Sequence, residues 1–156
     1  MSPKLNFEVI SLAKVPVGRP ADERKGRGRR VLVVDDERVI ADTLSVILSR
    51  SGLSVMTAYD GETALKLARA ATPNLLLSDV MLGPGMDGTQ LAIQMVGAFP
   101  ECKVLLFSGH AATADLLASA RRLGHNFTLM AKPVHPADLL ARITESFTTE
   151  DRLVEA

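Results

Sequence analysis

The sequence predicts an α/β fold, in which one doubly wound sheet of five parallel strands is covered by helices on both faces. Two observations predict it. From residue 31 onward, apolar runs alternate strictly with amphipathic segments, and there are five of each. The apolar runs are nearly continuous hydrocarbon, which is typical of parallel strands that are buried on both faces. The crossovers between successive strands are expected to be right-handed.

The expected strands are short runs rich in Val, Leu and other residues that suit a buried pleated surface. The first is VLVV, and two acids follow it directly. The second contains Met56, the third is LLL before Ser78, the fourth is VLLF, and the fifth ends at Lys132. In chain order, the five runs lie within residues 30–36, 53–60, 74–80, 102–109 and 127–133.

The expected helices carry apolar residues at helical spacing and end at helix-stopping residues. The first is followed by Gly52, the second by Pro73 and the fourth by Gly124. The last has Pro136 near its first turn, where the missing N–H of proline costs nothing. In chain order, the segments lie within residues 39–52, 60–73, 87–100, 113–124 and 135–147.

Length and composition limit the class of protein. A chain of 156 residues that is 47% hydrophobic and 23% charged suits one globular domain. No apolar stretch approaches the ~18 residues of a membrane span, and residues 1–18 hold no signal-peptide core. The single cysteine, Cys102, excludes a disulfide within the chain and is expected in the core. We therefore expect a cytoplasmic protein that does not enter a membrane.

The net charge of zero is unevenly distributed along the chain. Residues 1–30 hold eight Lys and Arg against three acidic residues, and the run ERKGRGRR (23–30) cannot form a packed face. No aromatic side chain lies within the run to stack on bases, so a solvated tail is favoured over contact with nucleic acid or acidic lipid. We therefore predict a flexible basic N-terminal arm (1–29), a folded domain (30–148) and a short C-terminal tail (149–156).

Polar side chains gather where the predicted strands end. In open α/β sheets, ligands bind outside the carboxyl ends of the strands. Residues from four strands should therefore meet at one edge of the sheet, and they are Asp35, Asp36, Glu37, Asp79, Ser108 and Lys132.

This set of groups suits phosphoryl transfer. Clustered carboxylates bind a hard divalent cation such as Mg²⁺, which neutralises phosphoryl oxygens. A lysine supplies a positive charge for phosphate, and a hydroxyl can donate a hydrogen bond to it. A carboxylate can itself be the nucleophile and carry the phosphoryl group. Asp79, placed at the end of an apolar strand, is the candidate nucleophile.

Four motifs in this order resemble the receiver domain of bacterial two-component response regulators: VLVVDDE, LLLSDVMLGPGMDG, LLFSGHA and MAKP. Each motif alone is common, but all four on alternating strands form a highly specific signal. The resemblance covers about residues 29–148 and implies a flavodoxin-like fold with strand order 2-1-3-4-5. It implies a signalling protein, which catalyses only its own phosphoryl transfer from phosphohistidine and its own dephosphorylation.

The resemblance also assigns roles to residues. It makes Asp79 the phosphoacceptor, Ser108 the hydroxyl that follows the phosphoryl group, and Lys132 its ion-pairing partner, followed by a cis peptide bond to Pro133. It implies that Mg²⁺ is held by Asp36 directly, by Asp35 largely through water, by Asp79 and by the backbone carbonyl of Met81. None of the three histidines has metal-ligand spacing, and only His110 is expected near the phosphoryl group.

Three features depart from the pattern of the family. The loop DVMLGPGMDG is one residue longer than the commonest form, so its shape should differ. Leu129 stands three residues before Lys132, where the family usually has Tyr or Phe. In the family, that aromatic ring usually changes position on phosphorylation, and an aliphatic side chain should give a smaller conformational change. The chain also ends eight residues after the expected folded domain (30–148), which predicts a receiver without an output domain.

We therefore predict a stand-alone response regulator of the chemotaxis-receiver type, phosphorylated on Asp79 with Mg²⁺ as cofactor. Its partners would be a histidine kinase or histidine phosphotransfer protein and a downstream protein. A homodimer through the fourth helix, fifth strand and fifth helix is a further expectation. The alternative is a receiver-like interaction scaffold that does not depend on phosphorylation. A dehalogenase-type phosphatase would need D-x-D after the first strand, and a dinucleotide-binding domain would need G-x-G-x-x-G there.

Overall fold

The computed structural model of the chain describes residues 29–109 and 113–155. Five parallel strands form one sheet in the order β2-β1-β3-β4-β5, which confirms the predicted fold class and strand order. The strands are β1 (Arg30–Val34), β2 (Ser54–Ala58), β3 (Leu75–Asp79), β4 (Lys103–Ser108) and β5 (Thr128–Ala131).

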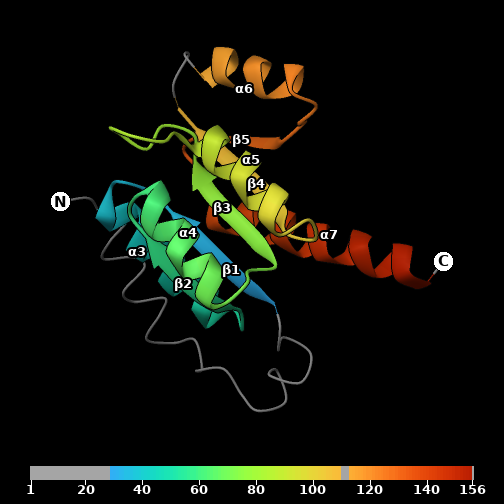
Figure 1. Cartoon of the computed structure of the whole chain (residues 1–156). Helices are drawn as coiled ribbons and strands as arrows, with labels where there is room; N and C mark the ends of the chain where they lie inside the picture. The colour runs from blue at the N-terminus through green and yellow to red at the C-terminus, as the bar shows by residue number, and fades with distance from the viewer. Residues whose placement is uncertain (1–28, 110–112, 156) are drawn as a thin grey trace.

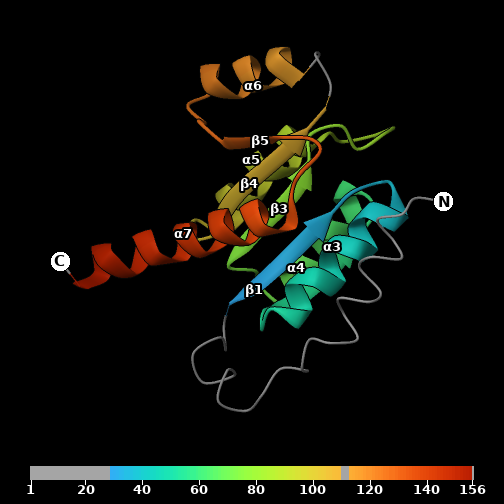
Figure 2. The same ribbon diagram turned by 180° about the vertical axis from the view of Figure 1, so that it is seen from behind.

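Within residues 29–109 and 113–155, five helices alternate with the strands and cover both faces of the sheet (Figure 1). Residues of α4 and α5 pack in one apolar cluster, with α6 beside them, and residues of α3 and α7 pack in the other. Figure 2 shows α3 and α7 together on the face opposite α4 and α5. The helices are α3 (Arg38–Arg50), α4 (Gly61–Ala70), α5 (Gly88–Ala98), α6 (Thr113–Arg122) and α7 (Pro136–Glu155).

The two apolar clusters follow from the period of two along the strands. In β1, Leu32 and Val34 join the cluster with α4 and α5, whereas Val31 and Val33 join the cluster with α3 and α7. Successive side chains of a strand point to opposite faces, so a strand covered on both faces must be apolar throughout. β1 and β3 therefore form the buried centre of the sheet, and both end at carboxylates.

The structure differs from the sequence-based expectation at the C-terminus. α7 continues to Glu155, eight residues beyond Phe147, where the sequence pattern placed the end of the last helix. Residues 148–155 contain neither Gly nor Pro, so nothing in that sequence stops the helix. The predicted arm, apart from Arg29, and His110 lie outside the described residues. Within the described ranges, no helix is both long and apolar enough to cross a membrane.

Candidate functional site

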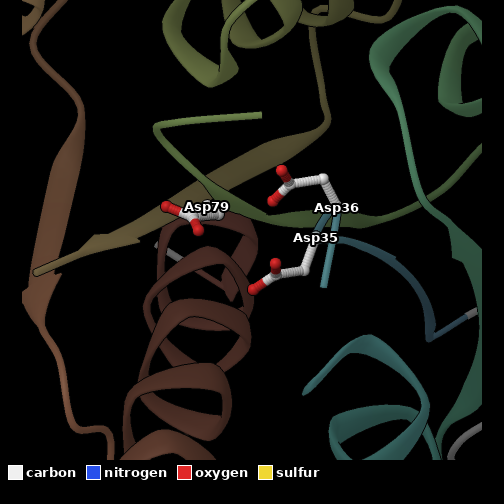
Figure 3. Close-up of side chains that lie close together, drawn as sticks. All are labelled: Asp35, Asp36 and Asp79. Carbon is white, nitrogen blue, oxygen red and sulfur yellow. The ribbon is translucent and has the colours of Figure 1, made fainter. Parts of the chain in front are cut away.

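Three carboxylates meet at the carboxyl ends of the two central strands. β1 and β3 pair in register, with Val34 opposite Ser78, so the next residues, Asp35 and Asp79, become neighbours. Ligand oxygens of Asp35, Asp36 and Asp79 all lie within 4.8 Å of one another. Figure 3 shows the carboxylates of Asp35 and Asp36 turned toward Asp79. The predicted convergence of acids at this edge is present.

Asp35 is the most deeply buried acid of the three, with none of its surface exposed. One carboxylate oxygen, Oδ1, accepts a hydrogen bond from the backbone N–H of Glu37 at 2.9 Å. The other, Oδ2, is buried and accepts no hydrogen bond. Burial raises the pKa of Asp35 to about 6, and the charges of Asp79 and Asp36 add to that rise. The second oxygen of Asp35 has the ammonium of Lys132 at 3.5 Å but accepts no hydrogen bond, so a bound cation would stabilise it further.

Asp79 ends β3 and is 4% exposed. Its Oδ1 accepts a hydrogen bond from the backbone N–H of Met81 at 3.1 Å, and its Oδ2 accepts one from Lys132 Nζ at 2.8 Å. The same ammonium group lies 3.5 Å from Asp35 Oδ2. Burial lowers the pKa of Lys132, but the hydrogen bond to Asp79 and the two carboxylate charges more than offset this and raise it. Lys132 therefore remains a cation between two buried anions.

The third carboxylate, Asp36, is exposed and lies beside the loop that follows β3. Gly83 has a φ of +75°, and a Cβ on it would lie 3.1 Å from Asp36 Oδ2. Asp36 does not begin the following helix, because the N-cap of α3 is Glu37. Two buried carboxylates, one of them with an oxygen that accepts no hydrogen bond, and a third carboxylate reachable from solvent form a donor set of the type that Mg²⁺ prefers. The residues present fit that ion.

Ser108 occupies the end of the neighbouring strand, one residue beyond the partner of Asp79 in β4. Its hydroxyl is hydrogen-bonded to the hydroxyl of Thr113, the first residue of α6. Sequence analysis missed Thr113 because a threonine at the start of a helix suggests only a cap. Leu129 lies in β5 opposite Leu106 and is 38% exposed.

Gly88 is a second residue that sequence analysis did not single out. The chain returns at this point directly behind Asp79, and the N–H of Gly88 donates to the carbonyl of Val80 at 2.7 Å. A Cβ on Gly88 would lie 2.1 Å from the carbonyl oxygen of Asp79. Asp87 then caps α5 in a capping box with Gln90, which fixes where the loop ends. Only glycine allows the loop to close against the strand that carries Asp79.

Replacing Gly88 with alanine should therefore destabilise the fold by about 1–3 kcal/mol or more, because backbone atoms of β3 must move. Gly97→Ala is the matched control in the same helix, since nothing lies within 4 Å of a Cβ there. It should leave the stability unchanged or raise it by up to about 0.5 kcal/mol, because alanine is the better helix former and Gly97 lies in the last turn of α5. Urea unfolding measures both effects, and equal stabilities of the two variants would contradict the close approach at Gly88.

The geometry defines a class of protein: a five-stranded α/β domain with an acidic pocket and a lysine at the carboxyl ends of its strands. The sequence model of the response regulator receiver domain matches residues 31–144. The chain is 35% identical over 115 residues to the alkaline phosphatase synthesis transcriptional regulatory protein PhoP of Bacillus subtilis, covering 74% of this chain and 47% of PhoP. It is 36% identical over 116 residues to the nitrogen assimilation regulatory protein NtrX of Azorhizobium caulinodans, covering 74% of this chain and 25% of NtrX.

A solved structure agrees with these sequence relatives. A CheY-like response regulator receiver domain protein from Methanospirillum hungatei superimposes with a TM-score of 0.71 at 29% identity, covering 80% of this chain and 97% of that one. The chain belongs to the response regulator receiver domain family. Members of this family are two-component signalling proteins that bind Mg²⁺ in an acidic pocket and interact with histidine kinases or phosphotransfer proteins. The chain spans less than half the length of PhoP and NtrX.

Proposed function

We propose that this receiver accepts a phosphoryl group on Asp79 from the phosphohistidine of a histidine kinase or histidine phosphotransfer protein. The observation that carries the proposal is the placement of Asp79. It is a buried carboxylate, hydrogen-bonded to Lys132, next to a second buried carboxylate whose Oδ2 accepts no hydrogen bond. Two buried carboxylates that share Lys132 as their cation are costly to keep in the folded protein. The arrangement therefore favours a divalent ion and a phosphoryl group as ligands of the site.

Mg²⁺ would be held by the carboxylates of Asp35, Asp36 and Asp79 and by the backbone carbonyl of Met81. When bound, the ion supplies positive charge to the phosphoryl oxygens. Asp79 forms the new P–O bond while the P–N bond of the donor breaks. The electron pair returns to that ring nitrogen, and the imidazole leaves as a neutral ring when its other nitrogen already carries a proton. Lys132 stabilises the negative charge on the transferring oxygens.

Ser108 would turn to donate its hydroxyl proton to a phosphoryl oxygen after transfer. Hydrolysis follows when water attacks phosphorus, the bond to the Asp79 oxygen breaks, and the carboxylate is regenerated with inorganic phosphate. The domain would thus catalyse its own phosphorylation and dephosphorylation. The state of Asp79 would bias a surface formed by α6, β5 and α7, where a downstream protein or a second copy could bind.

The proposal is tested by incubating the protein with acetyl phosphate and Mg²⁺ and measuring its intact mass. One phosphoryl group should be added, and it should be lost at alkaline pH, as expected for an acyl phosphate. The alternative function is an interaction scaffold that does not respond to phosphorylation, and the aliphatic Leu129 favours it. Beryllium fluoride with Mg²⁺ imitates the phosphoryl group, so an unchanged amide spectrum outside the acidic pocket would support the scaffold.

Metal binding gives a separate prediction. Mg²⁺ should raise the melting temperature of the chain, because an ion that binds only the folded state stabilises it by mass action. Asp36→Asn should lose most of that increase, since it removes a ligand that is reachable from solvent. Glu37→Gln is the matched control, because Glu37 is the neighbouring exposed acid and does not belong to the three-carboxylate cluster. Equal Mg²⁺ responses of the two variants, measured by differential scanning fluorimetry, would remove Asp36 from the site.

A further inference from the structure

The hydrogen bond between Ser108 and Thr113 connects the acidic site to α6. The two hydroxyl oxygens lie 2.5 Å apart, and the residues are 7% and 3% exposed. Within α6, only Thr113 and Ala120 are fully buried, while Leu116 and Leu117 are partly buried against the core. Figures 1 and 2 both show α6 at one end of the molecule, beside β5. Thr113 is therefore one of two buried points that fix this helix to the domain.

The backbone of Ser108 is held in place, so its hydroxyl can move only by rotation of the side chain. Ser108 is paired with Ala131 of β5, and its carbonyl accepts a hydrogen bond from the N–H of Lys132 at 3.0 Å. A serine side chain has three staggered positions about its Cα–Cβ bond. Each rotation moves the hydroxyl oxygen itself, whichever of the two hydroxyls is the donor in the pair with Thr113. Turning the hydroxyl toward a phosphoryl group on Asp79 therefore breaks its contact with Thr113.

We propose that Thr113 is a positioning residue that holds the Ser108 hydroxyl away from Asp79 before phosphorylation and passes its movement to the start of α6. This inference rests on the proposed function of Asp79. When Ser108 turns away, the hydroxyl of Thr113 is left buried without that partner, which costs more than the hydrogen bond itself was worth. A shift of the first turn of α6 relieves that cost, because Thr113 is the first residue of the helix.

This connection explains how the domain can switch without an aromatic side chain at position 129. The other two helices on that face of the sheet are held more firmly, since α4 buries four residues and α5 buries five. A helix with two buried residues moves at a lower cost in lost burial. Phosphorylation would therefore change the conformation of the domain mainly at α6, and Leu129 would contribute little to that change.

Beryllium fluoride binding in the presence of Mg²⁺, followed by amide spectra of the full chain, tests the proposal. Thr113→Val keeps the size of the side chain and removes its hydroxyl, whereas Thr113→Ser keeps the hydroxyl. Thr113→Val should bind beryllium fluoride roughly two- to tenfold more tightly, because one hydrogen bond to Ser108 no longer competes. Thr113→Ser should stay within about twofold of the wild type. The amide shifts of residues 115–122 caused by beryllium fluoride should fall to about half or less in Thr113→Val.

A double-mutant cycle separates this coupling from a general effect on packing. In a Ser108→Ala background, Thr113→Val should leave the beryllium fluoride affinity unchanged, because the competing hydroxyl is already absent. An equal gain in affinity in both backgrounds would overturn the role of Thr113, as would wild-type affinity and wild-type α6 shifts in Thr113→Val. If the wild type itself does not respond to beryllium fluoride, the proposed function of Asp79 fails and the inference fails with it. If Thr113→Val does not fold, Thr113→Ala takes its place in the cycle.

Discussion

Replacing Asp79 with asparagine should abolish phosphorylation by acetyl phosphate in the presence of Mg²⁺. The amide has the size of the carboxylate, so it can still fill the end of β3, although its single oxygen replaces two oxygens that accept from Met81 and Lys132 separately. It lacks the anionic oxygen that attacks phosphorus, and no acyl phosphate can form. Intact mass should show one added phosphoryl group in the wild type and none in the variant.

The matched control for this prediction is Glu101→Gln. Glu101 is an exposed acid before β4, at the edge of the sheet opposite the site, and its change is also from carboxylate to amide. This variant should be phosphorylated at the wild-type rate. Full phosphorylation of Asp79→Asn would show that Asp79 is not the phosphoacceptor. Loss of labelling in both variants would instead point to a general effect of removing an acid.

Asp35→Asn should make the metal-free protein more stable near pH 7, by up to about 3 kcal/mol. Burial raises the pKa of Asp35 to about 6, whereas an unfolded chain releases the same proton near 3.8. Folding therefore takes up a proton between these pH values, and the contribution of Asp35 to stability is lost as pH rises through about 6. Asparagine resembles the protonated acid at every pH, so the variant avoids this loss.

The test is urea unfolding of both proteins in chelator from pH 4 to pH 8. The difference in the free energy of unfolding between the variant and the wild type should be small near pH 4 and should grow until about pH 7. Saturating Mg²⁺ should reduce this difference in stability, because the wild type keeps the Asp35 carboxylate that binds the ion and the variant has lost it. A stability difference that does not change with pH would show that the Asp35 carboxyl is not the group responsible. Tm values alone would not suffice, since ΔG of unfolding must be compared at one temperature.

The alternation of strands and helices along the chain and most helix boundaries could be predicted because they depend on local pattern, whereas the order of the strands within the sheet came from the family resemblance. Continuous hydrocarbon such as VLVV predicts a central parallel strand, and Gly52 and Pro73 mark the end of the helices before them. The acids of the site could be located because parallel strands bring their carboxyl ends together. The continuation of α7 to Glu155 was missed, because amphipathic spacing weakens beyond Phe147 while no helix-stopping residue follows.

What could not be predicted depends on contacts between distant segments. Two adjacent acids give no sign of which is buried, yet Asp35 is buried and Asp36 is exposed. Gly88 reads as a turn residue until the chain is seen to return behind Asp79. The partner of Ser108 is similarly hidden, because Thr113 contacts it only through the placement of α6. Burial, close approach and hydroxyl pairing are all properties of the folded chain.

The position of the site within the sheet divides the molecule into parts that should open independently. Asp35 follows β1 and Asp79 ends β3. The apolar residues of these two strands are fully buried, so hydrogen exchange of β1 and β3 should require unfolding of the whole domain. α6 and β5 lie at one edge with few buried residues and should exchange through smaller, local openings. A ligand at the site would thus slow exchange in the centre through global stability. A change in the hydrogen exchange of α6 on ligand binding would instead show how the ligand alters the part of the domain that opens most easily.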